Sequence, residues 1–242
     1  RQRTSYGICL GLVGSKMFMR GRVRISQTAA SASAFVLTEQ KAAARDGEAP
    51  AKSGMGVVLG KRYRFGSLML WLSYFMGLVI FYALINWMPI LLKDAGMDPH
   101  KATLVAALFP LGGVGAVFFG WLMDRFNANL IIAFGYVLTA ASIYMIGQVV
   151  GNDGLLVVMV FVAGTIMNTA QSSLPALAAA FYPTQGRATG VSWMLGIGRF
   201  GGIAGSFLVA ELTARHMGFS QIFTVVAIPG LIAAAALLLK QW

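Results

Sequence analysis

A single arginine stands deep inside an otherwise uncharged hydrophobic run near the end of this sequence. Arg199 lies in YPTQGRATGVSWMLGIGRFGGIAG, residues 182–205. If a membrane span opens after Arg187, Arg199 lies about 12 residues into it, roughly 18 Å along a helix and near the middle of a hydrocarbon layer about 30 Å thick. A guanidinium there is costly and should face a cavity or a partner. That partner is either an anionic substrate or, as a structural alternative, backbone carbonyls or a carboxylate from elsewhere in the protein.

A second charged motif is GWLMDRF, residues 120–126, in which Asp124 and Arg125 follow the small residue Gly120 at the end of an apolar stretch. A carboxylate at this point can meet the positive N-terminus of a neighbouring helix or a cation, and so form a breakable latch. The ordinary alternative is a solvated ion pair worth less than about 1 kcal/mol.

The sequence contains no pattern that indicates an enzyme. GIGRFG, residues 196–201, fits G-x-G-x-x-G, but no strand precedes it and it lies inside an apolar span, which argues against a dinucleotide site. His100 and His216 lie in connections, with no cysteine or carboxylate cluster beside them that would hold a metal ion. We therefore expect no catalytic residues, no metal and no cofactor.

Composition indicates a membrane protein that crosses the bilayer several times. The 242 residues are 57% hydrophobic and only 11% charged, with a mean hydropathy of +0.72, whereas a soluble domain needs more polar surface. Twelve of the 19 lysines and arginines precede Gly66, so the net charge of +11 reads as a cytoplasmic face and not as a nucleic-acid-binding surface.

Six apolar segments, each long enough to span a bilayer, predict an all-α bundle of six transmembrane helices. The basic segment 1–64 precedes a bundle at 65–242, with spans at about 66–92, 102–122, 129–150, 154–181, 188–212 and 218–239. Basic residues favour one side of the spans, which places both termini in the cytoplasm. Glycines four residues apart, Gly198 with Gly202 and Gly201 with Gly205, predict close helix contacts.

Three stretches carry a family resemblance. GWLMDRF resembles the G-x-x-x-D-R pattern of major facilitator transporters, although Asn127 and Ala128 stand where the fuller pattern has glycine and a base. YPTQGRATGVSWMLGIGRFGG and LMLWLSYFMGLVIFY, residues 68–82, closely resemble the eleventh and seventh helices of the aromatic acid:proton symporters. The resemblance covers about Phe35 to the end, and the first 33 residues do not share it. It implies the C-terminal half of a twelve-helix major facilitator fold, whose missing partner is an N-terminal half of six helices.

The resemblance also implies roles for individual residues. Arg187 becomes a cytoplasmic-loop base that takes part in gating with Gly120, Asp124 and Arg125. Arg199 becomes the intramembrane cation, which can hold a benzoate carboxylate by a bidentate pair. Rings that could cover the substrate ring are Trp193, Tyr74 and Tyr82, and amides that could bind a ring hydroxyl are Asn86, Asn168 and Gln171. Packing or lipid contact is the alternative for each aromatic residue.

Together with the apolar segments and Arg199, the resemblance implies proton-coupled uptake of a small aromatic carboxylate, such as 4-hydroxybenzoate or protocatechuate, across a bacterial-type inner membrane. The proton gradient supplies the driving force. All eight acidic residues lie outside the predicted spans or at their ends, so the proton carrier is expected in the missing half. The alternatives are a major facilitator transporter of another organic anion or a drug, and a truncated fragment that transports nothing.

Overall fold

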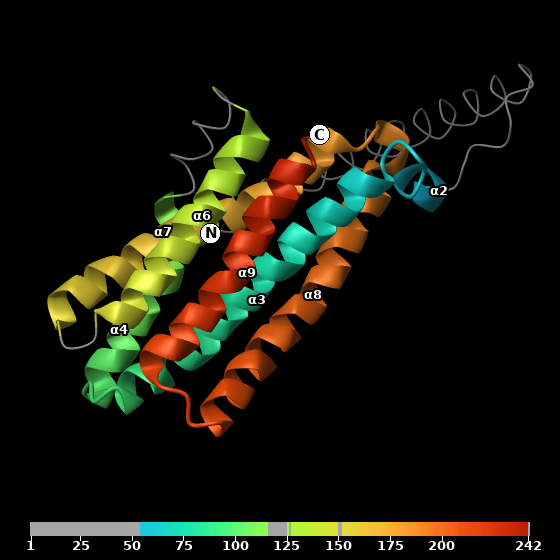
Figure 1. Ribbon diagram of the computed structural model, residues 1–242. Coiled ribbons are helices and arrows are strands. Elements are labelled where there is room, and N and C mark those ends of the chain that lie inside the picture. Colours follow the sequence, from blue (N-terminus) through green and yellow to red (C-terminus); the bar gives the residue numbers. More distant parts are fainter. Residues whose placement is uncertain (1–53, 116–124, 126, 150–151, 242) are drawn as a thin grey trace, which may run out of the picture. The chain divides into compact units, whose positions relative to one another are not determined.

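The computed structural model describes residues 54–115, 125, 127–149 and 152–241, and the regular structure in these ranges is helical throughout. The elements are α2 Gly54–Val58, α3 Arg64–Asp94, α4 Pro99–Leu111, the 3₁₀ helix η1 Gly112–Gly115, α6 Ala128–Gln148, α7 Asp153–Phe181, α8 Thr184–Ala214 and α9 Phe219–Leu239 (Figure 1). All of them belong to one compact unit, which begins at Ser53. The short helix α2 lies within the basic segment 1–64, and it packs against the start of α8.

Side-chain caps explain where three of these helices begin. The carboxylate of Asp98 accepts hydrogen bonds from the backbone N–H groups of the first turn of α4. Asn127 caps α6 by accepting from Asn129 N–H, and Asn152 caps α7 by accepting from Leu155 N–H. Such caps satisfy N–H groups that have no partner inside the helix.

Within the described ranges, five helices are long and apolar enough to cross a membrane: α3, α6, α7, α8 and α9. They correspond to five of the six predicted spans. The remaining span was predicted at 102–122; its described part consists of α4 and η1, and residues 116–124 lie outside the described residues. The six-span count therefore stays a prediction.

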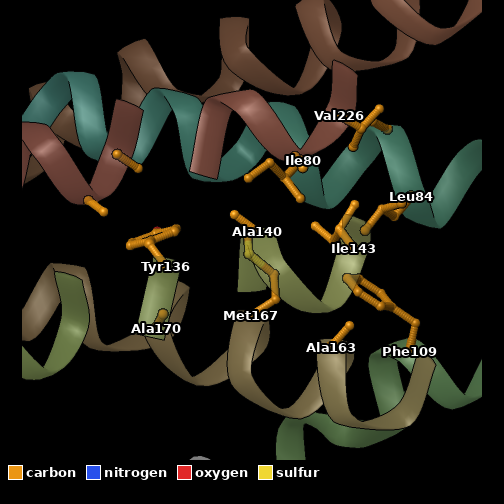
Figure 2. Close-up of a cluster of buried hydrophobic side chains, with 14 of the residues drawn as sticks. Ile80, Leu84, Phe109, Tyr136, Ala140, Ile143, Ala163, Met167, Ala170 and Val226 are labelled. Carbon is orange, nitrogen blue, oxygen red and sulfur yellow. The ribbon is translucent and has the colours of Figure 1, made fainter. Parts of the chain in front are cut away.

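The core of the bundle forms where α3, α4, α6, α7 and α9 meet. Figure 2 shows side chains from these helices converging, among them Ile80, Phe109, Tyr136, Met167 and Val226, and all five side chains are almost completely buried. α9 packs on α6 and α3, and α6 packs on α7. Helix α8 contributes less to this core, because its main contact is with α3 alone.

The contact between α8 and α3 depends on glycine, as the spacing predicts. A Cβ atom at Gly198 would overlap the ring of Tyr74, and one at Gly201 would overlap the carbonyl oxygen of Phe75. Without these Cβ atoms, the two helix backbones approach closely along much of their length. Away from this contact, α8 keeps large apolar side chains such as Phe200 and Phe207 exposed.

Candidate substrate-binding site

Arg199 occupies the middle of α8, with fifteen residues before it and fifteen after it in the helix Thr184–Ala214. The other charged residues in the five long helices, as far as the structure describes them, lie near helix ends. Among the described residues, the one ion pair joins Arg215 and Glu211 at 2.8 Å, so no described carboxylate neutralises Arg199. The side chain is exposed on the outer face of α8, where it is available to an anion.

A hollow of about 480 Å³ opens beside this arginine, between α3 and α8. It is lined by Leu78, Tyr82, Arg199, Gly202, Ile203, Ser206 and Phe207. Its volume lies in the range of about 300–1,000 Å³ that is usual for small-molecule sites. The lining is mostly apolar with a few polar groups, a combination that suits an aromatic ring carrying a charged substituent.

Two predicted ring-covering residues lie next to Arg199. Tyr82 lines the hollow, and its ring packs against Gly202, where a Cβ atom would come within 2.6 Å of it. Tyr74 lies within electrostatic range of both Arg199 and Tyr82, and its ring rests on Gly198. The glycines of α8 therefore allow two tyrosine rings of α3 to pack against this helix, and Tyr82 lines the hollow whereas Tyr74 does not.

Asn86 also reaches this site, through a serine that the sequence reasoning missed. Its Nδ2 donates to Ser206 Oγ at 2.8 Å, and Ser206 Oγ donates to the carbonyl oxygen of Gly202 at 3.2 Å. The signal for Ser206 was present in the spacing, because it follows Arg199 by seven residues and two helical turns return to the same face. Its modest polarity gave no reason to single it out.

The two other predicted amides lie elsewhere and have partners within the protein. Asn168 Nδ2 donates to the carbonyl oxygens of Phe109 at 2.9 Å and Gly164 at 2.8 Å, which ties α4 to α7. Gln171 is only 8% exposed; its Oε1 accepts from Tyr136 at 2.6 Å and its Nε2 donates to the Tyr74 carbonyl at 3.4 Å. Neither lines the hollow, so a substrate role for them stays a prediction.

Trp193 does not line the hollow either. Its ring stacks on Trp71 with centroids 6.2 Å apart, although 47% of its surface stays exposed. Trp193 precedes Arg199 by six residues, which places it on a different side of α8.

The predicted gating residues are described only in part. Gly120 and Asp124 lie outside the described residues. Arg125 is exposed and takes part in an interaction within the chain. Arg187 was predicted to lie in a loop, and this placement is wrong: α8 begins at Thr184, so Arg187 is in its first turn. The reason is Pro183, whose φ of −65° directly before the helix favours an early start.

Comparison with known protein families identifies the family to which the chain belongs. Residues 33–241 match the Major Facilitator Superfamily. The chain belongs to this superfamily of transporters. It is 45% identical over 215 residues to the 4-hydroxybenzoate transporter PcaK of Pseudomonas putida, an alignment that covers 88% of this chain and 47% of PcaK.

Other members of the superfamily that resemble the chain also have aromatic acids in their names. The gallate transporter of Pseudomonas putida is 45% identical, with 79% of this chain and 42% of that protein covered. The 3-(3-hydroxy-phenyl)propionate transporter of Escherichia coli is 36% identical, with 69% and 41% covered. The chain spans about half the length of these relatives. Family membership and the five long apolar helices identify a multi-pass membrane protein of a transporter family, not an enzyme.

Proposed function

We propose that the hollow between α3 and α8 binds the carboxylate of a small aromatic acid during proton-coupled uptake across the inner membrane. The observation that carries the proposal is the position of Arg199, at the centre of α8 and at the edge of a mostly apolar hollow. An uncompensated guanidinium at that depth is costly, and an incoming carboxylate offsets the cost through paired hydrogen bonds. The names of the relatives support an aromatic acid as the substrate.

Tyr82, which lines the hollow, gives the site its preference for an aromatic ring, and Tyr74 packs on α8 beside Gly198. Tyr82 and Tyr74 lie against α8 beside Arg199, and aromatic faces favour offset or edge contacts with another ring. An aliphatic acid would satisfy the arginine but would forgo these contacts. We therefore expect benzoates to bind in preference to aliphatic carboxylates of similar size.

Proton coupling requires an ionisable group near the centre of the bundle, and none of the described carboxylates lies there. The described carboxylates Asp94, Asp98, Asp153 and Glu211 all lie at or near helix ends, and an arginine keeps its proton. We propose that the proton carrier lies in a second six-helix bundle, which corresponds to the part of the relatives that this chain does not match. The two bundles would then form the two walls of one site, with both termini of this chain in the cytoplasm and the Asp124–Arg125 motif latching the cytoplasmic side.

The test is uptake of labelled 4-hydroxybenzoate by cells that express the full chain together with the unmatched part of PcaK, with and without a protonophore. Each half expressed alone is the control, and membrane insertion and co-purification of the two halves are measured in parallel. Uptake that needs both halves and is abolished by the protonophore is expected. Assembled halves that take up no benzoate, or uptake indifferent to the protonophore, would contradict the proposal. A panel of benzoates, aliphatic acids and drugs as competitors distinguishes the solute.

A further inference from the structure

The hollow is lined by a cation, Arg199, and by the hydroxyl of Ser206, which is hydrogen-bonded to the amide of Asn86. Ser206 follows Arg199 by seven residues on α8, which places it on the same face at a distance of about 10.5 Å along the helix axis. Gly202 lies between them, and the ring of Tyr82 packs against it. Asn86 of α3 is exposed and does not itself line the hollow, but its hydrogen bond to Ser206 holds its amide beside the Ser206 end.

The hydrogen bonds within this pair fix which groups remain for a ligand. Ser206 Oγ uses its proton on the Gly202 carbonyl, so it must accept from Asn86, and this sets the orientation of the Asn86 amide. Among the described groups, the Oδ1 atom and the second N–H of Asn86 have no hydrogen-bond partner. A carbonyl-type acceptor therefore lies beside the Ser206 end of the hollow, and such an acceptor suits a group that can donate a hydrogen bond.

We propose that Asn86, held by Ser206, recognises the para-hydroxyl group of a 4-hydroxybenzoate whose carboxylate is bound by Arg199. This inference rests on the proposed function and deepens it. The carboxylate and the para-hydroxyl lie at opposite ends of the ring, and Arg199 and Ser206 lie two helical turns apart along one face of α8. The phenolic O–H donates to Asn86 Oδ1. An unsubstituted benzoate leaves that acceptor without a partner, and a 4-methoxy group brings no proton to donate.

The preference for 4-hydroxybenzoate over the two analogues follows from the free-energy cost of leaving a polar group of the site without a hydrogen-bond partner. A site that is built to bind a hydroxyl rejects the analogue that lacks it more strongly than an apolar pocket rejects a missing methylene. Asn86 lies at the exposed rim and not in a sealed pocket, so water moderates the effect. We expect the wild-type chain to prefer 4-hydroxybenzoate over benzoate and over 4-methoxybenzoate by about fivefold, the worth of one hydrogen bond.

The experiment measures initial uptake rates of labelled 4-hydroxybenzoate and labelled benzoate by the full chain assembled with the unmatched part of PcaK. The variants are Asn86→Leu, which removes the acceptor, and Ser206→Ala, which removes the group that orients it. Thr224→Ala on α9 is the control, because its hydroxyl bonds only the carbonyl oxygen of Ser220 in its own helix and does not line the hollow. Membrane abundance is measured for every variant.

The expected result is a loss of about fivefold in Vmax/KM for 4-hydroxybenzoate in both variants, with the value for benzoate changed by less than about twofold. A selectivity ratio that stays at the wild-type value, or equal losses for both acids, would overturn the role of the pair and leave the proposed function intact. A wild-type assembly that is inserted and takes up neither acid would overturn the proposed function itself. Because Ser206→Ala removes a single oxygen atom, it still tests the inference if Asn86→Leu fails to insert.

Discussion

Gly205 lies directly against the backbone of Val79, so that a Cβ atom at this position would overlap the Val79 carbonyl oxygen. A side chain can rotate away from a new methyl group, but a carbonyl inside a helix cannot. The contact therefore sets the separation of α8 and α3, and with it the width of the hollow between them. Gly201 makes the same kind of contact with Phe75 one turn earlier.

Gly205→Ala should destabilise the bundle by about 1–3 kcal/mol, the usual cost of forcing a methyl group into a packed contact. Gly196→Ala on the same helix is the matched control, because a Cβ atom there would meet nothing within 4 Å, and alanine is the better helix former. The measurement is the thermal midpoint of the detergent-solubilised chain, followed by size-exclusion chromatography. Equal midpoints for the two variants would show that the helices separate at no cost.

The packing of α3 against α8 was predictable from the sequence only in part. The spacing of Gly198, Gly201 and Gly205 predicts a close helix contact, because the absence of Cβ atoms on one helix face is visible in the sequence. Which helix fills the space is not visible, since any apolar span could do so. The early start of α8 was missed because hydropathy rises only after Arg187, whereas the helix itself begins after Pro183.

Two substitutions of Arg199 should distinguish the contribution of its charge from that of its bidentate geometry. Arg199→Ala removes both, and we expect uptake of 4-hydroxybenzoate to fall by about tenfold or more, in line with the strength of hydrogen bonds to charged groups. Arg199→Lys keeps the charge but loses the bidentate fork, so we expect a smaller loss, mainly in affinity. The measurement is KM and maximal uptake rate in the assembled transporter.

The matched controls for Arg199 are Arg215→Ala and Arg215→Lys, because Arg215 is an exposed arginine just past the end of the same helix, paired with Glu211. Both controls should leave uptake unchanged. If Arg199→Ala and Arg199→Lys both match the wild type, Arg199 neither binds the substrate nor couples transport, and the structural alternative for this cation holds.

The hydrogen bond between Tyr136 and Gln171 should contribute to stability and not to substrate selectivity. Tyr136→Phe removes a hydroxyl that is fully buried between α6 and α7 and leaves Gln171 Oε1 without its donor, which we expect to cost about 1–2 kcal/mol. The double variant Tyr136→Phe with Gln171→Leu should recover part of that loss, because neither partner is then left unpaired.

A thermal-unfolding cycle of the wild type, both single variants and the double variant measures the coupling between Tyr136 and Gln171. Uptake ratios for 4-hydroxybenzoate and benzoate, measured on the same four proteins, should stay constant. A changed ratio with an unchanged midpoint would instead place Gln171 in contact with the substrate.

The positions of the predicted amides show why a binding site is harder to predict from sequence than a transmembrane span. Asn168 and Gln171 share a helix face and were grouped for that reason, but their partners, Phe109, Tyr136 and Tyr74, come from three other helices. Sequence spacing describes one helix at a time and contains no information on what the next helix offers. Arg199 could be identified from the sequence because the free-energy cost of a guanidinium in a membrane does not depend on its neighbours. Ser206 could not, because what distinguishes it is its hydrogen bond to Asn86 on another helix.

Lys240 should give the folded bundle a measurable dependence on pH. It follows the last residue of α9; its Nζ donates to Asn129 Oδ1 at 3.0 Å and lies 4.6 Å from the centroid of the Phe181 ring. Both neighbours are uncharged, and burial lowers the pKa of Lys240 from 10.5 to about 8. The unfolded chain therefore binds more protons than the folded chain between about pH 8 and pH 10.5, so this residue makes stability rise with pH across that window. Below pH 8 both states carry the charge, and the full desolvation cost remains.

We expect the difference in unfolding midpoint between the wild type and Lys240→Met to shift in favour of the wild type as the pH is raised from 7.5 to 10. Lys93→Met, at an exposed lysine near the end of α3, is the control and should keep the wild-type pH profile, including the contributions of other groups that titrate in this range. The measurement is thermal unfolding in detergent at a series of pH values. Parallel profiles for the wild type and Lys240→Met would mean that the ammonium group is not desolvated between α6, α7 and α9, and that the end of α9 is held by apolar packing alone.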